Sequence, residues 1–320
     1  MRQKISLIYI FVLVLCVASN DVFAQPSTIY FNNKTWEQLV AKQDTLKEFS
    51  LYLNTDSLTE DRMVADSQFT RTLVRALQLP NSFYFPFDSV KGIANLYAPD
   101  SSFRIITWTL QFNDYYCRQR GAIQMKTRDG SLRLFPLRDA SEFTDKPEDS
   151  VRSTRNWIGA AYYAMVKKEY LGKSYYTLFG IDANNAMSTL KWIEVLHFSS
   201  QGEPVFGGPF FSYERDSVPR PNQYRIQLEY KKNASVLMNY DATMDLIVID
   251  HLISENDDVA HKWTYVPDGD QEGFRWEKGK WIHIHKVFHQ KLQDGQAPHE
   301  VPLFENKDRI KITPSKKKEN

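Results

Sequence analysis

The sequence has few cysteines, almost no net charge and no long apolar run beyond its first residues. It contains two cysteines, Cys16 and Cys117, in 320 residues. The 40 basic and 39 acidic side chains leave a formal net charge of +1, which excludes a basic nucleic-acid-binding protein and a strongly acidic disordered chain. A mean hydropathy of −0.48 excludes a membrane protein with several spans. What remains is a globular protein, long enough for one large domain or two small ones.

The common catalytic motifs are also missing. The sequence has no G-x-S-x-G, H-E-x-x-H, G-x-x-x-x-G-K-[ST] or G-x-G-x-x-G, which are the patterns of hydrolase elbows, zinc proteases and phosphate-binding loops. Their absence removes the enzyme classes that a short motif identifies. It leaves open a hydrolase that works through carboxylates or a metal.

Residues 1–24 have the pattern of a signal peptide. Two basic residues precede an apolar run over residues 5–18, and a small residue, Ala24, stands directly before Gln25. The apolar run is shorter than the roughly 20 residues that span a bilayer. We therefore expect an exported protein, periplasmic or associated with the outer membrane, whose mature chain has no transmembrane span. Its single remaining cysteine, Cys117, excludes an intramolecular disulfide.

Two periodicities divide the mature chain. Apolar residues recur at helical spacing over residues 36–77, which predicts an N-terminal helical segment, a helical pair, over 25–88. From residue 91 to about residue 288 the period changes to two, as in residues 224–230, where apolar and polar side chains alternate. This predicts a mainly β protein with an antiparallel β domain at 89–290. Residues 291–320 are expected to form an irregular basic tail.

The β domain divides into three units of about four strands, at residues 91–139, 157–212 and 224–288. Short polar turns separate the strands, which is typical of an antiparallel meander. A sandwich, an open barrel and a propeller-like arrangement all remain open. The polar segment 141–156 is the best candidate for a long surface loop or a weak boundary.

An acidic segment is the first candidate site. Asp268, Asp270 and Glu272 stand at alternate positions and Gly273 is the sixth residue, which matches the first half of a calcium-binding loop. The twelfth position is Gly279, where such a loop has a glutamate. An acidic hairpin turn is therefore the favoured interpretation, and calcium binding is the alternative.

A histidine pair is the second candidate site. His283 and His285 are two residues apart in a predicted strand, so their side chains share a face and could reach one zinc ion. A catalytic zinc needs a third ligand, for which the candidates are His197, His251 and His289. Polar residues on the solvated face of a strand explain the pair equally well, and we expect no cofactor.

Aromatic side chains are the third candidate. They make up 14% of the sequence, and Trp263, Trp276 and Trp281 lie in or beside predicted strands. Flat aromatic rings with polar neighbours suit stacking against sugars. Aromatic residues also fill the cores of β proteins, which is the alternative interpretation.

Four segments carry a resemblance to known proteins: residues 175–182 (YYTLFGID), 191–196 (KWIEVL), 202–207 (GEPVFG) and 247–252 (IVIDHL). Together they resemble an uncharacterised group of exported β-rich proteins from Bacteroidetes-type bacteria. The resemblance implies an envelope location. It implies no activity and assigns no catalytic residue.

These observations predict an exported, envelope-associated binding or scaffold protein without enzymatic activity, with a glycan or an envelope protein as its partner. Two alternatives remain open. One is a glycan- or cell-wall-directed hydrolase that uses carboxylates or a metal. The other is an assembly partner of an outer-membrane complex.

Overall fold

The computed structural model describes residues 31–218 and 220–288, so the predicted signal peptide (1–24) and basic tail (291–320) lie outside the described residues. The first elements are two helices, α1 (Asn33–Thr55) and α2 (Thr59–Leu77). The Asn32 side chain caps α1 by accepting a hydrogen bond from the backbone N–H of Lys34 at 3.0 Å. The predicted helical pair is confirmed.

The first sheet follows the helices and runs in the order β1-β2-β3-β4. Its strands are β1 (Ala94–Tyr97), β2 (Phe103–Asn113), β3 (Tyr116–Met125) and β4 (Arg133–Arg138). All three neighbouring pairs are antiparallel, and they form a simple meander. This sheet corresponds to the first predicted unit, 91–139.

The second sheet runs in the order β5-β9-β8-β7-β6, and β11 also pairs with β8. Its strands are β5 (Arg152–Ser153), β6 (Ala161–Tyr170), β7 (Lys173–Asp182), β8 (Ser188–Phe198), β9 (Pro204–Phe206) and β11 (Arg225–Lys231). The third sheet runs in the order β10-β15-β14-β13-β12. Its strands are β10 (Phe211–Ser212), β12 (Met238–Asp241), β13 (Leu246–Ser254), β14 (Tyr265–Glu277) and β15 (Lys280–Ile284). Thus β10 and β11 each join the sheet of the neighbouring unit.

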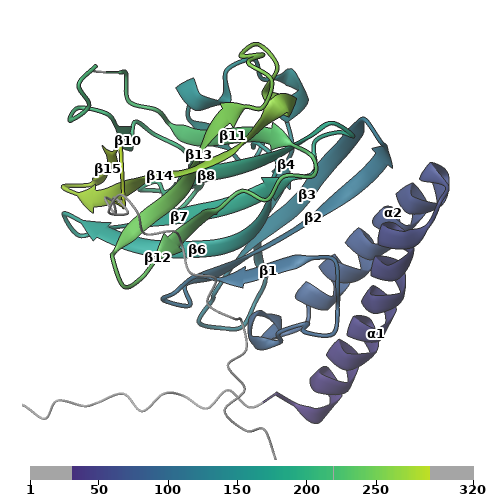
Figure 1. The fold of residues 1–320 in the computed structure, drawn as a ribbon. Coiled ribbons are helices and arrows are strands. Elements are labelled where there is room, and N and C mark those ends of the chain that lie inside the picture. The colour runs from purple at the N-terminus through teal and green to yellow at the C-terminus, as the bar shows by residue number, and fades with distance from the viewer. Residues whose placement is uncertain (1–30, 219, 289–320) are drawn as a thin grey trace, which may run out of the picture.

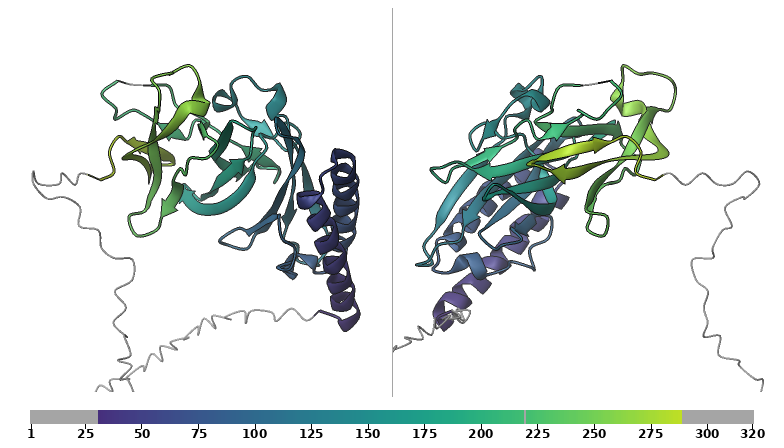
Figure 2. Two further views of the ribbon diagram at one scale, coloured as in Figure 1. Left: turned by 45° about the vertical axis from the view of Figure 1, so that its right-hand side comes forward. Right: turned by 90° about the vertical axis from the view of Figure 1, so that its left-hand side faces the viewer.

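The helices and sheets stack as layers (Figures 1 and 2), and three apolar cores lie between them. One core lies between the helices and the first sheet, a second between the first and second sheets, and a third between the second and third sheets. Successive strand residues point to opposite faces, so Ile105 and Ile106 of β2 enter different cores. In β8, Trp192 and Ile193 likewise enter different cores.

The fold-class prediction is confirmed: the protein is mainly β, with two N-terminal helices followed by antiparallel sheets. Within the described residues the sheets stay open and do not close into a barrel. The stacked layers also differ from the radial blades of a propeller. Neither α1 nor α2, nor any shorter helix in the described part, is long and apolar enough to cross a membrane.

Candidate functional site

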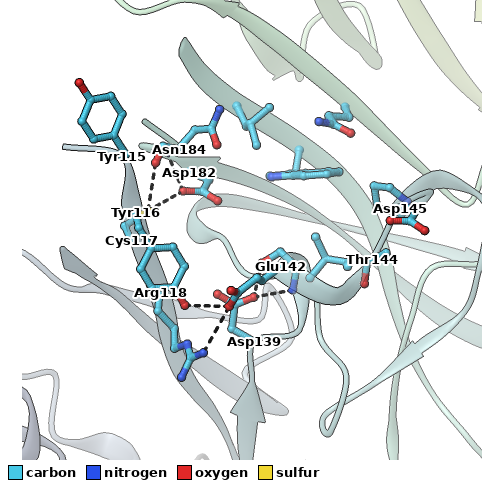
Figure 3. Close-up of a pocket in the computed structure, with 16 residues that line it drawn as sticks. Tyr115, Tyr116, Cys117, Arg118, Asp139, Glu142, Thr144, Asp145, Asp182 and Asn184 are labelled. Carbon is cyan, nitrogen blue, oxygen red and sulfur yellow. Dashed lines mark hydrogen bonds and ion pairs between the residues drawn. The ribbon is translucent and has the colours of Figure 1, made fainter. Parts of the chain in front are cut away.

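A pocket of about 320 Å³ opens at one end of the interface between the first and second sheets (Figure 3). We call it the acidic pocket, because four carboxylates line it: Asp139, Glu142, Asp145 and Asp182. Its volume falls at the small end of the ~300–1,000 Å³ typical of ligand sites. The other lining residues are Tyr115, Tyr116, Cys117, Arg118, Ser141, Thr144, Pro147, Ile158, Asn184, Leu190, Trp192 and Gln227.

Strands of the second sheet place the apolar part of the lining. Leu190 and Trp192 are two residues apart in β8 and therefore share a face. Gln227 of β11 stands opposite Trp192 and adds an exposed amide. Trp192 is 4% exposed, and its Nε1 is buried without a hydrogen-bond partner among the described residues. Buried donors are nearly always paired, so this indole N–H is an unsatisfied group on a residue that lines the pocket.

Asp182 ends β7 and is the most buried carboxylate of the pocket. Its Oδ1 accepts hydrogen bonds from the Gln119 side chain at 3.0 Å and from the backbone N–H of Asn184 at 2.9 Å. Burial raises the pKa of Asp182 above its ordinary value, and the nearby charge of Asp139 adds to the rise. The hydrogen bonds to the carboxylate oppose the rise.

Asp139 follows β4 and is fixed by donors from three segments. It accepts hydrogen bonds from the backbone N–H groups of Gln119 at 2.8 Å, Ser141 at 3.0 Å and Gly159 at 3.2 Å. A Cβ atom at residue 159 would lie 2.5 Å from Asp139 Oδ2, so only glycine allows this approach. Gln119 therefore contacts both acids, with its backbone on Asp139 and its side chain on Asp182.

The rim of the pocket carries an exposed charged cluster. In Figure 3 the side chains of Tyr116 and Arg118 both point toward Glu142. The Tyr116 hydroxyl donates to Glu142 at 3.0 Å, and Arg118 Nη2 lies 3.7 Å from the same carboxylate. Tyr115 points away from this cluster and is 76% exposed.

A buried ion pair holds the segment 141–156 against the second sheet. Arg225 Nε lies 3.2 Å from Glu194 Oε2, and both side chains are almost fully buried. The Arg225 guanidinium also donates to the carbonyl oxygens of Pro147 and, at 2.9 Å, Ser150. Because Pro147 lines the acidic pocket, this buried arginine positions part of the rim.

Cys117 lies inside the pocket, but as a protected thiol. Its Sγ donates to Asp182 Oδ1 at 3.1 Å. Burial raises the pKa of the Cys117 thiol, and the charge of Asp182 raises it further. A thiol held in this protonated form is a poor nucleophile.

The predicted calcium-loop residues lie outside the acidic pocket. Asp268, Asp270 and Glu272 belong to the antiparallel strand β14, where Glu272 pairs with Ile249 of β13 and the other two lie at a bulge between the paired residues Pro267 and Gln271. Asp268 accepts from His251 at 2.8 Å, and Asp270 pairs with Lys286 at 2.9 Å. These carboxylates therefore already have partners.

The predicted histidine pair forms a different arrangement from a zinc site. His283 is buried between two carboxylates, with Nδ1 2.7 Å from Asp216 and Nε2 3.0 Å from Glu272. His285 is exposed, and its ring centre lies 6.5 Å from that of His283. Burial opposes the charged form of His283, but the two carboxylates outweigh this effect and raise its pKa.

Metal ligation finds no support in this region. Within residues 31–218 and 220–288, no group of three or more His, Cys, Asp or Glu side chains is placed to hold a metal ion. His251 and Glu272 instead line a second pocket of about 430 Å³ beside the third sheet. The calcium and zinc assignments therefore stay predictions.

The three predicted sugar-stacking tryptophans are separated by the fold. Trp281 is fully buried, and its Nε1 donates to Thr177 at 2.9 Å, so it is a core residue. Trp276 is half-buried and packs 5.3 Å from Trp281. Trp263 is 37% exposed and stacks near His261, with ring centres 4.3 Å apart. None of the three lines the acidic pocket.

No pattern in the sequence predicts the acidic pocket. Asp139, Asp182 and Trp192 come from three different elements and form no short motif. The sequence contains one usable signal, a carboxylate at each of two strand ends, Asp139 after β4 and Asp182 at the end of β7.

Comparison with protein-family models, curated proteins and solved structures finds no match.

Proposed function

We propose that this protein is exported and binds a small hydroxyl-rich ligand, a glycan fragment, in the acidic pocket without chemically changing it. The observation that carries the proposal is the buried Trp192 Nε1, which has no partner among the described residues. A ligand oxygen that accepts from this N–H would remove the cost of a buried unsatisfied donor. The proposal thus keeps the predicted class, an exported glycan-binding protein. It replaces the predicted tryptophan site with the acidic pocket.

The remaining lining suits a sugar. Sugar hydroxyls both donate and accept, and carboxylates and amides are the side chains that satisfy both roles. The pocket offers these groups beside an indole: the carboxylates of Asp139 and Asp182, and the amides of Asn184 and Gln227. Apolar side chains beside a few fixed polar groups are typical of a small-molecule site, and here Ile158, Leu190 and Trp192 supply the apolar part.

The binding proposal is tested by titrating the purified protein with a panel of mono- and oligosaccharides in a calorimeter. We expect saturable binding of at least one saccharide. Trp192→Phe removes only the N–H donor and part of the ring, and it should weaken that binding by about 1 kcal/mol, roughly fivefold. Trp263→Phe changes a tryptophan outside the acidic pocket and is the matched control, with unchanged affinity.

Two results would contradict the proposal. Absence of saccharide binding would favour the assembly-partner alternative. Release of shortened saccharides during incubation would show a hydrolase that uses the carboxylates of the pocket.

The export proposal needs a separate test. If residues 1–24 are a signal peptide, N-terminal sequencing of the protein from the cell-envelope fraction should begin at Gln25. An intact N-terminus on protein recovered from the cytosol would contradict export and leave the binding proposal standing.

A further inference from the structure

The acidic pocket contains more carboxylates than basic side chains. We call Asp139 and Asp182 the inner carboxylates, because Glu142 and Asp145 are exposed. Arg118 is the one basic side chain among its described lining residues, against four carboxylates. It lies 3.7 Å from Glu142, which is exposed on the rim. The only lining cation is therefore engaged away from Asp139 and Asp182.

The two inner carboxylates have only neutral partners. In residues 31–218 and 220–288, neither Asp139 nor Asp182 forms an ion pair. Their donors are backbone N–H groups, the Gln119 amide, the Cys117 thiol and the Ser141 hydroxyl. Asp182 is 8% exposed, and carboxylates as buried as this are normally paired with a cation.

Gln119 links the two acids through hydrogen bonds. Its backbone N–H donates to Asp139 at 2.8 Å and its side-chain amide donates to Asp182 at 3.0 Å. Gln119 itself is 1% exposed and is not a lining residue, whereas both acids line the acidic pocket. A cationic group in the pocket would therefore approach the two linked carboxylates from the pocket side. Trp192 is an independent sign of a ligand, because its buried Nε1 donor requires an acceptor that the described residues do not supply.

We propose that the ligand of the acidic pocket carries an ammonium group that binds Asp139 and Asp182, and an oxygen that accepts from Trp192 Nε1. The inference rests on the proposed function and narrows it to a glycan with a free amino group. An amino sugar supplies both features on one ring, since its ammonium group has hydroxyl oxygens as neighbours. Neutral and N-acetylated sugars supply only the oxygens.

The test compares three probes by calorimetric titration of the whole protein: a glucosamine tetrasaccharide, its fully N-acetylated counterpart, and butylamine. We expect the glucosamine tetrasaccharide to bind at least about tenfold more tightly than the N-acetylated one, because only its ammonium groups can pair with the carboxylates of Asp139 and Asp182. The comparison uses the unchanged protein and therefore needs no variant to fold.

Variants then locate the ammonium group. Asp182→Asn and Asp139→Asn keep the size of the side chain and its acceptor oxygen, and each should weaken glucosamine binding at least about tenfold. Asp257→Asn removes an exposed carboxylate outside the acidic pocket and is the matched control, with less than a twofold change. Thermal unfolding of each variant reports whether it is folded.

The outcomes separate the two proposals. The ammonium inference is overturned if both tetrasaccharides bind equally, or if Asp139→Asn and Asp182→Asn leave binding unchanged. Either result leaves a neutral-glycan site. Butylamine binding as tight as that of the tetrasaccharide supports the ammonium site and overturns the glycan function. Absence of binding by all three probes overturns both proposals.

Discussion

At the residue scale, the environment of Cys117 decides its chemistry. The thiol is partly buried and donates to Asp182, and both burial and the neighbouring charge raise its pKa. Because the thiolate is the reactive form, we expect the native protein to react with iodoacetamide at pH 8 far more slowly than the urea-unfolded chain. Asp182→Asn removes the charge and should speed the reaction. Equal rates in the native and unfolded states would contradict this account.

His283 gives a second prediction at this scale, on stability and pH. The pKa of His283 is higher in the folded protein than in the unfolded chain, where it is about 6.5. Its contribution to the free energy of unfolding is therefore fully present below about pH 6.5 and is lost as the pH rises through the folded pKa. Glu272 and Asp216 have lowered pKa values, because hydrogen bonds from His283 outweigh their burial. Their contribution is lost as pH falls through those values.

The interaction of His283 with Asp216 and Glu272 therefore stabilises the folded protein most at mildly acidic pH. We expect His283→Gln to lower the melting temperature most near pH 5–6, and the difference from the unchanged protein to shrink toward alkaline pH. His261→Gln changes an exposed histidine and should alter stability little at every pH. A His283→Gln difference that grows with rising pH would contradict the assignment.

At the element scale, the segment 141–156 is positioned by a strand distant in sequence. Arg225 of β11 pairs with Glu194 and donates to carbonyl oxygens in this segment. Replacement of one partner leaves a buried uncompensated charge, so Arg225→Met should destabilise the protein by about 3–5 kcal/mol. Urea unfolding measures this loss.

The double variant supplies the control. Glu194→Gln combined with Arg225→Met removes both charges and should recover part of the stability lost in Arg225→Met alone. A double variant that loses more stability than the two single variants lose together would contradict a paired role for the two residues.

Local elements could be predicted from the sequence, and their partners in the sheets only in part. The helical spacing over residues 36–77 and the alternation over 224–230 depend on each segment burying one face, which a single sequence records. The pairing of β11 with β8 and of β10 with β15 depends on contacts between segments far apart in the sequence, which no local pattern records. The acidic pocket is built from such long-range neighbours, which explains why Asp139, Asp182 and Trp192 formed no visible motif.

At the scale of the whole molecule, the layers share their cores. Ile106 and Trp108 of β2 pack with helix residues such as Phe69 and Leu73, so the helical pair covers one face of the first sheet. The Trp108 indole also donates to Asp66 of α2 at 2.8 Å. The predicted boundary between 25–88 and 89–290 therefore passes through one of the cores.

We accordingly expect a chain shortened to residues 89–290 to expose this apolar face and to lose cooperative unfolding. The whole protein should melt in a single calorimetric transition. A shortened chain with a sharp transition and the same near-ultraviolet circular dichroism as the whole protein would show that the two segments are independent domains.

The central claim, that a ligand satisfies the buried Trp192 donor, is tested most directly by nuclear magnetic resonance of the indole N–H groups. The sequence contains 7 tryptophans, and the Trp192→Phe variant identifies the Trp192 signal by its loss. On titration with the glucosamine tetrasaccharide, we expect the Trp192 signal to shift and saturate while the Trp263 signal stays in place. A Trp192 signal that stays unchanged at saturating saccharide would contradict the account.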